Sequence, residues 1–402
     1  MDANYRMRPA NAKAVDTLDL VHHHAVGGSV SEAEFSIIES LEGVDEQQWQ
    51  ALAGDNPTLA YRFLHTLHTT RCACPQTGWT PRYLVMYRDG VLHGAMPLYL
   101  KHHSRGEYVF DHAWADAFHR NGIEYYPKLL SAVPFSPVTG SRLLARSAED
   151  RALLARAVLQ VARQLETSSL HILFPDEDDR QALAAAGFML REGVQFHWEN
   201  QGYADFDAFL AGFKMDKRKK IRQDRRRVFD AGITFQHLAG AAITPEVMAF
   251  FYQCYVSTYL AHGNKPYLSL AFFEQLRAQM AEHIMIVLAQ RGDQPVAVAL
   301  NLVGGGIMYG RYWGTTEFVS GLHFETCYVQ AIEYCITHGI ARFEGGAQGV
   351  HKMSRGLSPT PTWSAHWVAD PRFAAAIGDF LAQETAAIEQ YIDELAEHAP
   401  FK

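Results

Sequence analysis

The sequence lacks the features that identify several classes of protein. No apolar run approaches the roughly 18 residues that a membrane-spanning helix requires. The first residues are polar and mixed in charge rather than basic and then apolar. Five cysteines form no paired pattern, and Cys72-Ala73-Cys74 has the wrong spacing for a zinc knuckle or a redox pair. We therefore expect a cytoplasmic protein with free thiols, no metal and no membrane span.

Composition predicts two folded units. A chain of 402 residues that is 48% hydrophobic can bury two ordinary cores, because single domains usually hold about 100–200 residues. We place a loosely ordered leader at residues 1–44, a first domain at 45–200 and a second at 201–402. The boundary lies near Gln201.

The hydrophobic pattern indicates the same order of elements twice. In the first half it predicts helices over 45–50, 57–70, 148–166 and 180–186, a hairpin around Asp89-Gly90, a strand over 169–174 and a strand pair over 188–198. In the second half it predicts helices over 245–260, 270–281 and 323–338, a hairpin around Arg291-Gly292-Asp293, and strands over 307–313 and 341–344. The repeat predicts tandem mixed α/β domains, each with its own mixed sheet, that superpose on one another.

Basic residues are concentrated in one segment of a chain whose net charge is −8. Residues 214–227 contain nine basic side chains against two acidic ones. Ile221 and Val228 would give a helix there one narrow apolar stripe. Two interpretations stay open: a solvated linker helix, or an element that contacts the phosphates of RNA or of a phosphorylated substrate.

Glycines gather near the end of the second half. The segments are Tyr309-Gly310-Arg311-Tyr312-Trp313-Gly314, Phe343-Glu344-Gly345-Gly346-Ala347-Gln348-Gly349 and His351-Lys352-Met353-Ser354-Arg355-Gly356. A strand that ends in glycines before a basic loop presents backbone N–H groups and a cation to an anionic group. This pattern is typical of a ligand site.

These segments resemble the second half of the Fem family of peptidoglycan aminoacyltransferases, and the chain is similar to uncharacterised bacterial Fem-like proteins from about Leu41 to Asp370. Further segments that carry the resemblance are Trp114-Ala115-Asp116-Ala117, Tyr125-Tyr126-Pro127-Lys128-Leu129 and Pro134-Phe135-Ser136-Pro137-Val138-Thr139-Gly140. The resemblance implies two domains of the GNAT acyltransferase fold. The chain lacks the Gln/Arg-x-x-Gly-x-Gly/Ala loop with which ordinary GNAT enzymes bind coenzyme A.

The sequence shows no Ser/His/Asp or Cys/His arrangement that would indicate a catalytic nucleophile. The remaining mechanism is direct attack of an amine on an activated acyl carbon. Lys352 matches the lysine that faces the acyl group in Fem enzymes, and Asp116 is the first choice for the base, ahead of Glu344 and His351. The remaining candidates for substrate contacts are the cations Lys128, Arg142, Arg218, Arg222, Arg311 and Arg355, the aromatic residues Trp114, Tyr126, Phe135, Tyr312 and Trp313, and the glycines Gly345 and Gly346.

Three functions remain open at this point. The first is transfer of an aminoacyl group from aminoacyl-tRNA to an amine on a cell-wall precursor, a peptide or a small molecule, as the resemblance and the basic segment suggest. The second is acetyl-CoA-dependent N-acetylation, which the missing loop disfavours. The third is a non-catalytic module that binds cell-wall precursors. In the first two, the donor is a co-substrate and no cofactor is bound tightly.

Overall fold

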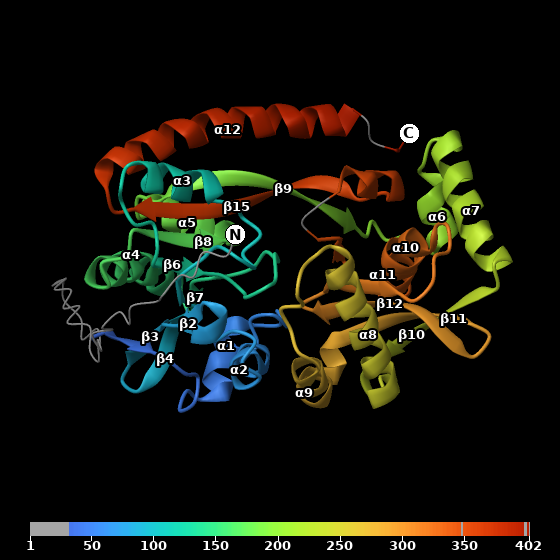
Figure 1. Cartoon of the computed structure of the whole chain (residues 1–402), viewed down its shortest axis with the longest axis horizontal. Helices are drawn as coiled ribbons and strands as arrows, with labels where there is room; N and C mark the ends of the chain where they lie inside the picture. The colour runs from blue at the N-terminus through green and yellow to red at the C-terminus, as the bar shows by residue number, and fades with distance from the viewer. Residues whose placement is uncertain (1–31, 347–348, 398–399, 402) are drawn as a thin grey trace, which may run out of the picture.

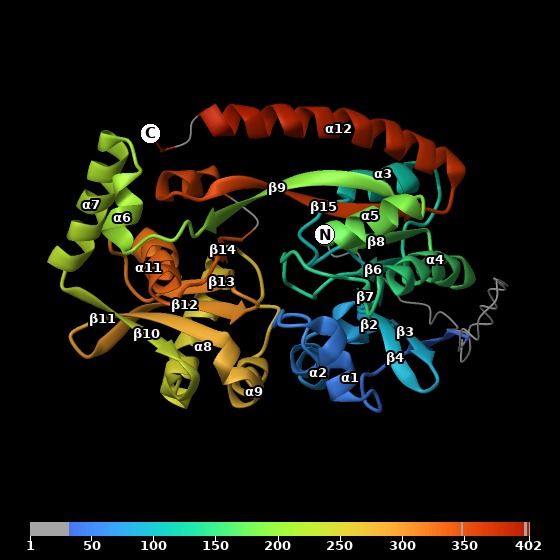
Figure 2. The same ribbon diagram turned by 180° about the vertical axis from the view of Figure 1, so that it is seen from behind.

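A computed structural model describes residues 32–346, 349–397 and 400–401. Two lobes lie side by side, and the long helix α12 (Pro371–Glu397) runs along the top of the first lobe and ends where the second begins (Figures 1 and 2). The expected leader is only partly within the described residues. Its last part is ordered, because β1 (Glu34–Ile38) pairs with a strand of the first lobe and Leu41 is fully buried. The expectation of a loose leader is wrong for this stretch.

The first half contains nine strands and five helices in the part of the chain that is described. The strands are β1, β2 (Trp79–Pro81), β3 (Tyr83–Arg88), β4 (Val91–Met96), β5 (Tyr99–Lys101), β6 (Lys128–Ser131), β7 (Leu144–Ala145), β8 (Ser169–Leu173) and β9 (Met189–Glu199). The helices are α1 (Glu46–Ala53), α2 (Tyr61–Thr69), α3 (His112–Arg120), α4 (Ala148–Gln164) and α5 (Glu177–Ala185).

The second half contains the predicted basic helix, α7, but a short helix, α6, precedes it, so the basic helix does not open this half as expected. Its helices are α6 (Phe206–Ala211), α7 (Met215–Asp230), α8 (Pro245–Ala261), α9 (Leu270–Met280), α10 (Leu322–Phe324), α11 (Gln330–Thr337) and α12. Its strands are β10 (Ile233–Ala239), β11 (Ile284–Arg291), β12 (Gln294–Gly304), β13 (Ile307–Thr315), β14 (Arg342–Glu344) and β15 (Ser358–Val368). Helix starts follow local chemistry, since Asp45, Ser147 and Thr244 each cap a helix by accepting a first-turn N–H.

Strands of both halves join in one eleven-stranded sheet, in the order β10-β11-β12-β13-β14-β9-β15-β8-β6-β5-β2. The remaining strands form a small sheet, β1-β3-β4-β7. The expectation of two separate sheets is therefore wrong, because β14 pairs with β9 and β15 lies between β9 and β8. The predicted strand pair over 188–198 is also wrong, since β9 is one long strand.

Each half nevertheless contains one parallel strand pair joined by a crossing helix. Helix α4 connects β6 to β8, and the helical segment α10–α11 connects β13 to β14. The hairpins predicted around Asp89-Gly90 and Arg291-Gly292-Asp293 are confirmed as β3–β4 and β11–β12. The two halves also share a hydrophobic core, in which Phe63 of α2 packs edge-on against Phe272 of α9.

The joined sheet predicts that the first half does not fold alone. A fragment that ends at Gln201 contains β8 and β9 but lacks β14 and β15, so β8 would present an unpaired edge and the long strand β9 would have no partner in the sheet. We expect this fragment to aggregate or to melt without a cooperative transition in circular dichroism. Residues 32–402 serve as the control and should melt cooperatively, and a cooperative transition in the short fragment would contradict the account.

Candidate functional site

The second half contains a pocket where β13 and β14 separate. The two strands pair over only three residues each, up to Tyr309 and Glu344, after which the chain turns at Gly345-Gly346 while β13 continues to Thr315. We call the cavity of about 440 Å³ at this point the splay pocket. It is lined by Tyr108, Pro137, Tyr255, Thr258, Tyr259, Gly310, Arg311, Tyr312, Trp313, His323, Tyr328, Gly345, Gly346, His351 and Lys352.

Glycine is required where the chain leaves β14. Gly346 has a φ of 86°, which other residues rarely adopt, and a Cβ on Gly345 would lie 2.5 Å from a methyl group of Leu357. This turn brings the Gly346 carbonyl within 2.9 Å of the Lys352 ammonium, which donates to it. Ala347 and Gln348 of the predicted motif lie outside the described residues.

Lys352 is a buried cation at the edge of this pocket. The residue is 4% exposed. Among the described residues its ammonium has the Gly346 carbonyl as its hydrogen-bond partner and no carboxylate at ion-pair distance. Burial without a counter-ion lowers the pKa of Lys352 to about 8. The ammonium is therefore charged at neutral pH and incompletely neutralised by protein groups.

A single turn of π-helix, Glu325–Val329, borders the pocket between α10 and α11. Such turns are uncommon and are often found at functional sites. Here the turn presents Tyr328 to the splay pocket, and Cys327 to a smaller cavity of about 140 Å³ that shares several lining residues with it. Burial raises the pKa of the Cys327 thiol well above its usual range, which argues against a thiolate nucleophile.

Arg311 is part of the pocket wall and also connects the two halves. Its guanidinium donates to the carbonyl of Phe135 at 2.5 Å and to the hydroxyl of Ser136 at 3.1 Å. It also lies over the ring of Tyr312. These contacts hold the loop that contains Phe135 against the second half, so the splay pocket is walled by residues of both halves.

A basic groove lies next to the splay pocket. It has a volume of about 420 Å³ and is lined by Lys217, Lys220, Asp224, Arg227, Ser320, Gly321, Phe324, Ser354 and Arg355. The 3-10 segment Val350–Arg355 separates the two cavities, with His351 and Lys352 on one side and Ser354 and Arg355 on the other. Arg355 pairs with Asp224 at 2.9 Å. Four cations and one carboxylate line the groove, so basic side chains predominate from α7 to the segment beside the splay pocket.

The other arginines of α7 differ in their surroundings. Arg222 is exposed and pairs with Asp207 at 2.8 Å, and Arg218 is partly exposed. Arg225 instead reaches two acidic residues of the crossing helix, Glu325 and Glu333. Neither Arg218 nor Arg222 lines the basic groove.

Glu344 and His351 lie on different sides of the glycine turn. His351 lines the splay pocket, and burial lowers its pKa, so the imidazole is neutral at pH 7. Glu344 is 2% exposed, and burial raises the pKa of its carboxyl to about 7. The Arg342 guanidinium lies 3.1 Å from Glu344 Oε1 without hydrogen-bond geometry. Glu344 does not line the pocket.

Several predicted site residues of the first half are outside the pocket. Asp116 is exposed on α3, so the structure does not bring the expected base to the reacting groups. Trp114 packs edge-on against His366, and Tyr126 contacts the hydroxyl of Ser104. Phe135 is buried and stacks on Tyr267, although its carbonyl binds Arg311.

Two predicted phosphate ligands are instead buried structural cations. The Arg142 guanidinium donates to the carbonyls of Leu173, Val138, Gly140 and Ser141, at the carboxyl end of β8. This is the position in the first half that corresponds to the splay pocket in the second, so Arg142 occupies it. Lys128 binds Glu107 and Asp111 and is fully buried.

Sequence reasoning missed about half of the pocket. Tyr255 and Tyr259 of α8 line it one helical turn apart, and this spacing in an aromatic-rich helix was a usable signal. Tyr108 and Pro137 come from loops of the first half. No local pattern predicts them, because the contact depends on how the halves join.

The family of the chain follows from comparison with known proteins. Residues 40–402 match the model of the FemAB-like family, described as peptidoglycan biosynthesis/recognition, and the chain belongs to this family. Membership supports a peptidoglycan-related acyltransferase. No curated protein matches the chain.

Three solved structures share the fold with a TM-score of 0.52 each. One is the C-terminal domain (DUF2156) of a putative lysylphosphatidylglycerol synthetase from Agrobacterium fabrum, 12% identical over 84% of this chain and 96% of that one. FemX is 14% identical over 83% and 98%, and L-PGS from Bacillus licheniformis is 11% identical over 84% and 97%. The predicted fold class, tandem GNAT-like α/β domains, is confirmed.

Within the described residues, no helix combines the length and the apolar character that crossing a bilayer requires. The same part of the chain contains no cluster of three or more His, Cys, Asp or Glu side chains that is arranged to hold a metal.

Two of the buried lysines, Lys352 and Lys128, should respond oppositely to removal of their charge. Lys352→Met removes a cation whose burial costs stability at pH 7, so the melting temperature should stay the same or rise. Lys128→Met leaves Asp111 buried without its cation and leaves Glu107 with Lys101 alone, at 3.8 Å, which should cost about 3–5 kcal/mol. Thermal and urea unfolding measure both effects. A large loss of stability in Lys352→Met would show that this lysine is structural.

Proposed function

We propose that the protein is an acyltransferase that moves an aminoacyl group from aminoacyl-tRNA to an amine of a peptidoglycan precursor or a related peptide. The observation that carries the proposal is the Lys352 ammonium, buried beside the Gly345-Gly346 turn without a neutralising carboxylate. A cation in this condition costs stability and is suited to stabilise a negative charge that the substrate supplies. Family membership agrees with this chemistry.

In the proposed reaction the acceptor amine attacks the carbonyl carbon of the aminoacyl ester. A C–N bond forms, the ester C–O bond breaks, and the carbonyl oxygen carries negative charge in between. The Lys352 ammonium stabilises this oxyanion. The proton of the amine passes to the neutral His351 imidazole and then to the departing ribose oxygen. This path replaces Asp116 as the base, since none of the described lining residues is a carboxylate.

The choice of a tRNA donor is supported by the basic groove beside the pocket. Lys217, Lys220 and Arg227 line the groove on α7, and only the Val350–Arg355 segment separates it from Lys352. A donor with phosphates in the groove would reach the splay pocket with its acyl end. A polynucleotide carries phosphates along its whole length, which fits a basic helix better than the single pyrophosphate of coenzyme A.

The donor is tested by incubating the purified protein with a peptide acceptor and either radiolabelled aminoacyl-tRNA or radiolabelled acetyl-CoA. We expect label to appear in the peptide only with aminoacyl-tRNA. Transfer from acetyl-CoA alone would make the protein an N-acetyltransferase. Binding of the acceptor without transfer from either donor would favour a non-catalytic module.

Removing the Lys352 charge should reduce the rate more than the affinity. Lys352→Met should lower single-turnover transfer by about 10²–10³-fold with little change in acceptor Kd, because the ammonium acts on charge that develops in the transition state. Wild-type transfer should fall as pH rises through about 8, where Lys352 loses its proton. The rate of the Lys352→Met variant should not show this fall with rising pH. A change in Kd alone would make Lys352 a binding residue.

The basic groove should determine donor affinity and its salt dependence. Replacing Lys217, Lys220 and Arg227 by Gln should weaken binding of aminoacyl-tRNA and flatten the slope of log K against log salt. Arg225 is left intact because it pairs with the buried Glu325. As a matched control, the exposed Arg71, Arg120 and Arg372 are replaced in the same way. If log K falls with log salt equally steeply in both triple variants, α7 is a solvated surface helix and does not bind the donor.

A further inference from the structure

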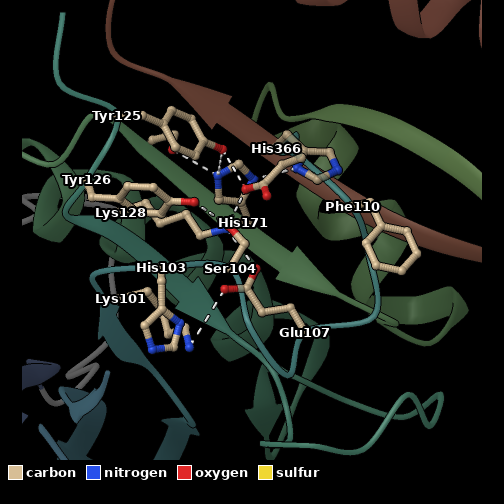
Figure 3. A network of polar contacts seen from close by, with 12 residues as sticks. Lys101, His103, Ser104, Glu107, Phe110, Tyr125, Tyr126, Lys128, His171 and His366 are labelled. Atoms are coloured by element: carbon tan, nitrogen blue, oxygen red, sulfur yellow. Dashed lines mark hydrogen bonds and ion pairs between the residues drawn. The ribbon is translucent and has the colours of Figure 1, made fainter. Parts of the chain in front are cut away.

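The loop from Ser104 to Asp111 in the first half is held by a buried ionic network. The Lys128 ammonium donates to Ser104 Oγ at 2.8 Å, to Glu107 Oε2 at 2.7 Å and to the carboxylate of Asp111 (Figure 3). Lys128, Glu107 and Asp111 are each at most 4% exposed. All three ammonium protons thus bind the same loop, near its beginning, middle and end. We call these residues the Lys128 network.

A chain of polar side chains extends the network into the sheet. The Tyr125 hydroxyl donates to Asp111 Oδ2 at 2.7 Å and lies 3.1 Å from His171 Nε2. The His171 and His366 rings meet through their Nδ1 atoms at 2.7 Å, as Figure 3 shows from close by. Because His171 is on β8 and His366 on β15, the loop is fixed to the strands that join the two halves.

The loop presents Tyr108 in a strained conformation. Tyr108 has a φ of 66°, which is uncommon for a residue other than glycine and persists only where the surroundings fix it. On one side Glu107 is bound to Lys128, and on the other the Phe110 carbonyl accepts a hydrogen bond of 2.8 Å from Arg191. Arg191 is itself held by both carboxylate oxygens of Glu384 on α12.

Tyr108 lines two cavities. One is the splay pocket, where Tyr108 lies close to Tyr259, Tyr312 and Arg311. The other, which we call the rear groove, has a volume of about 180 Å³ and lies between β9, β15 and α12. Tyr108 is the residue that the two sets of described lining residues share. Burial raises the pKa of its phenol to about 12, so the partition between the cavities is uncharged.

We propose that Tyr108 is a specificity-determining residue, whose ring closes the splay pocket toward the rear groove and so limits the length of acceptor that the site admits. The Lys128 network positions this ring. The inference rests on the proposed function in one respect, namely that the acyl group lies against Lys352. The acceptor then enters from the opposite wall, which Tyr108 and Pro137 supply from the first half.

The rear groove has the chemistry to bind a longer acceptor if the partition is removed. Thr362 lines it with a hydroxyl group, Arg191 and Glu384 add an ion pair, and Glu192 adds a second carboxylate. These groups provide the hydrogen-bond donors and acceptors that the peptide units of an extended chain need.

The test uses a ladder of N-acetylated peptide amides of one to five residues, each with one lysine as its amine. Calorimetry gives Kd for each peptide, and single-turnover assays with aminoacyl-tRNA give the transfer rate. For wild type and Tyr108→Phe we expect the affinity to stop improving after the first residues. For Tyr108→Ala we expect the five-residue peptide to gain about tenfold in affinity over wild type. Identical ladders for wild type and Tyr108→Ala would overturn the proposal.

The role of the Lys128 network is tested with Glu107→Gln, which keeps the shape of the side chain and is milder than removing Lys128. For this variant the dependence of Kd on peptide length should lie between those of wild type and Tyr108→Ala, measured at a temperature where both variants are folded. Glu177→Gln, an exposed carboxylate that pairs with Arg180, is the matched control and should give the wild-type ladder. If Kd depends on peptide length in Glu107→Gln as it does in wild type, the Lys128 network does not position Tyr108. The two proposals can fail separately. If no peptide accepts an acyl group but Kd still changes with peptide length as expected for each variant, the proposed function is wrong, and Tyr108 still limits the length of the bound peptide.

Discussion

The pairing of β9 with β14 and β15 is the constraint on which the rest of the structure depends. β9 belongs to the first half by sequence, yet its two neighbours in the sheet come from the last quarter of the chain. These hydrogen bonds fix the distance between the lobes, and the Arg311 contacts to the Phe135 loop hold the same junction from the pocket side. The splay pocket is therefore a product of the junction, since its walls come from both halves.

Two buried lysines show how one side chain serves either the fold or the site. Lys128 meets two carboxylates, which keep it charged and raise its pKa despite burial. Lys352 meets one carbonyl, and its pKa falls. The first arrangement stabilises a loop, whereas the second leaves an electrostatic demand that a substrate oxyanion satisfies in the proposed function. The ends of the parallel strands differ in a similar way. In the first half Arg142 binds at the carboxyl end of β8, and in the second half the splay pocket opens where β13 and β14 separate.

Most elements followed from local signals, because hairpin turns, helix caps and periodic apolar residues act over a few residues. The hairpins, the crossing helices and the basic helix α7 are examples. The joined sheet could not be predicted, since nothing in the sequence of β15 indicates that it pairs with the distant strands β8 and β9. Lys352, His351, Arg311, Tyr312, Trp313, Gly345 and Gly346 were predicted and do line the splay pocket. Asp116 and Arg142 were wrongly assigned to the site, because local sequence does not show whether a charged side chain is exposed, as Asp116 is on α3, or bound to backbone carbonyls, as Arg142 is. Tyr108 was missed because its place depends on the fold of both halves.

The central claim is that an acyl group binds at the glycine turn with its carbonyl oxygen facing Lys352. A crystal structure with a stable amide-linked analogue of the aminoacyl-adenosine end of tRNA tests it most directly. We expect the carbonyl oxygen within hydrogen-bond distance of Lys352 Nζ and the adenosine on the side of the basic groove. An acyl group bound in the rear groove, or beside Lys128 in the first half, would contradict it.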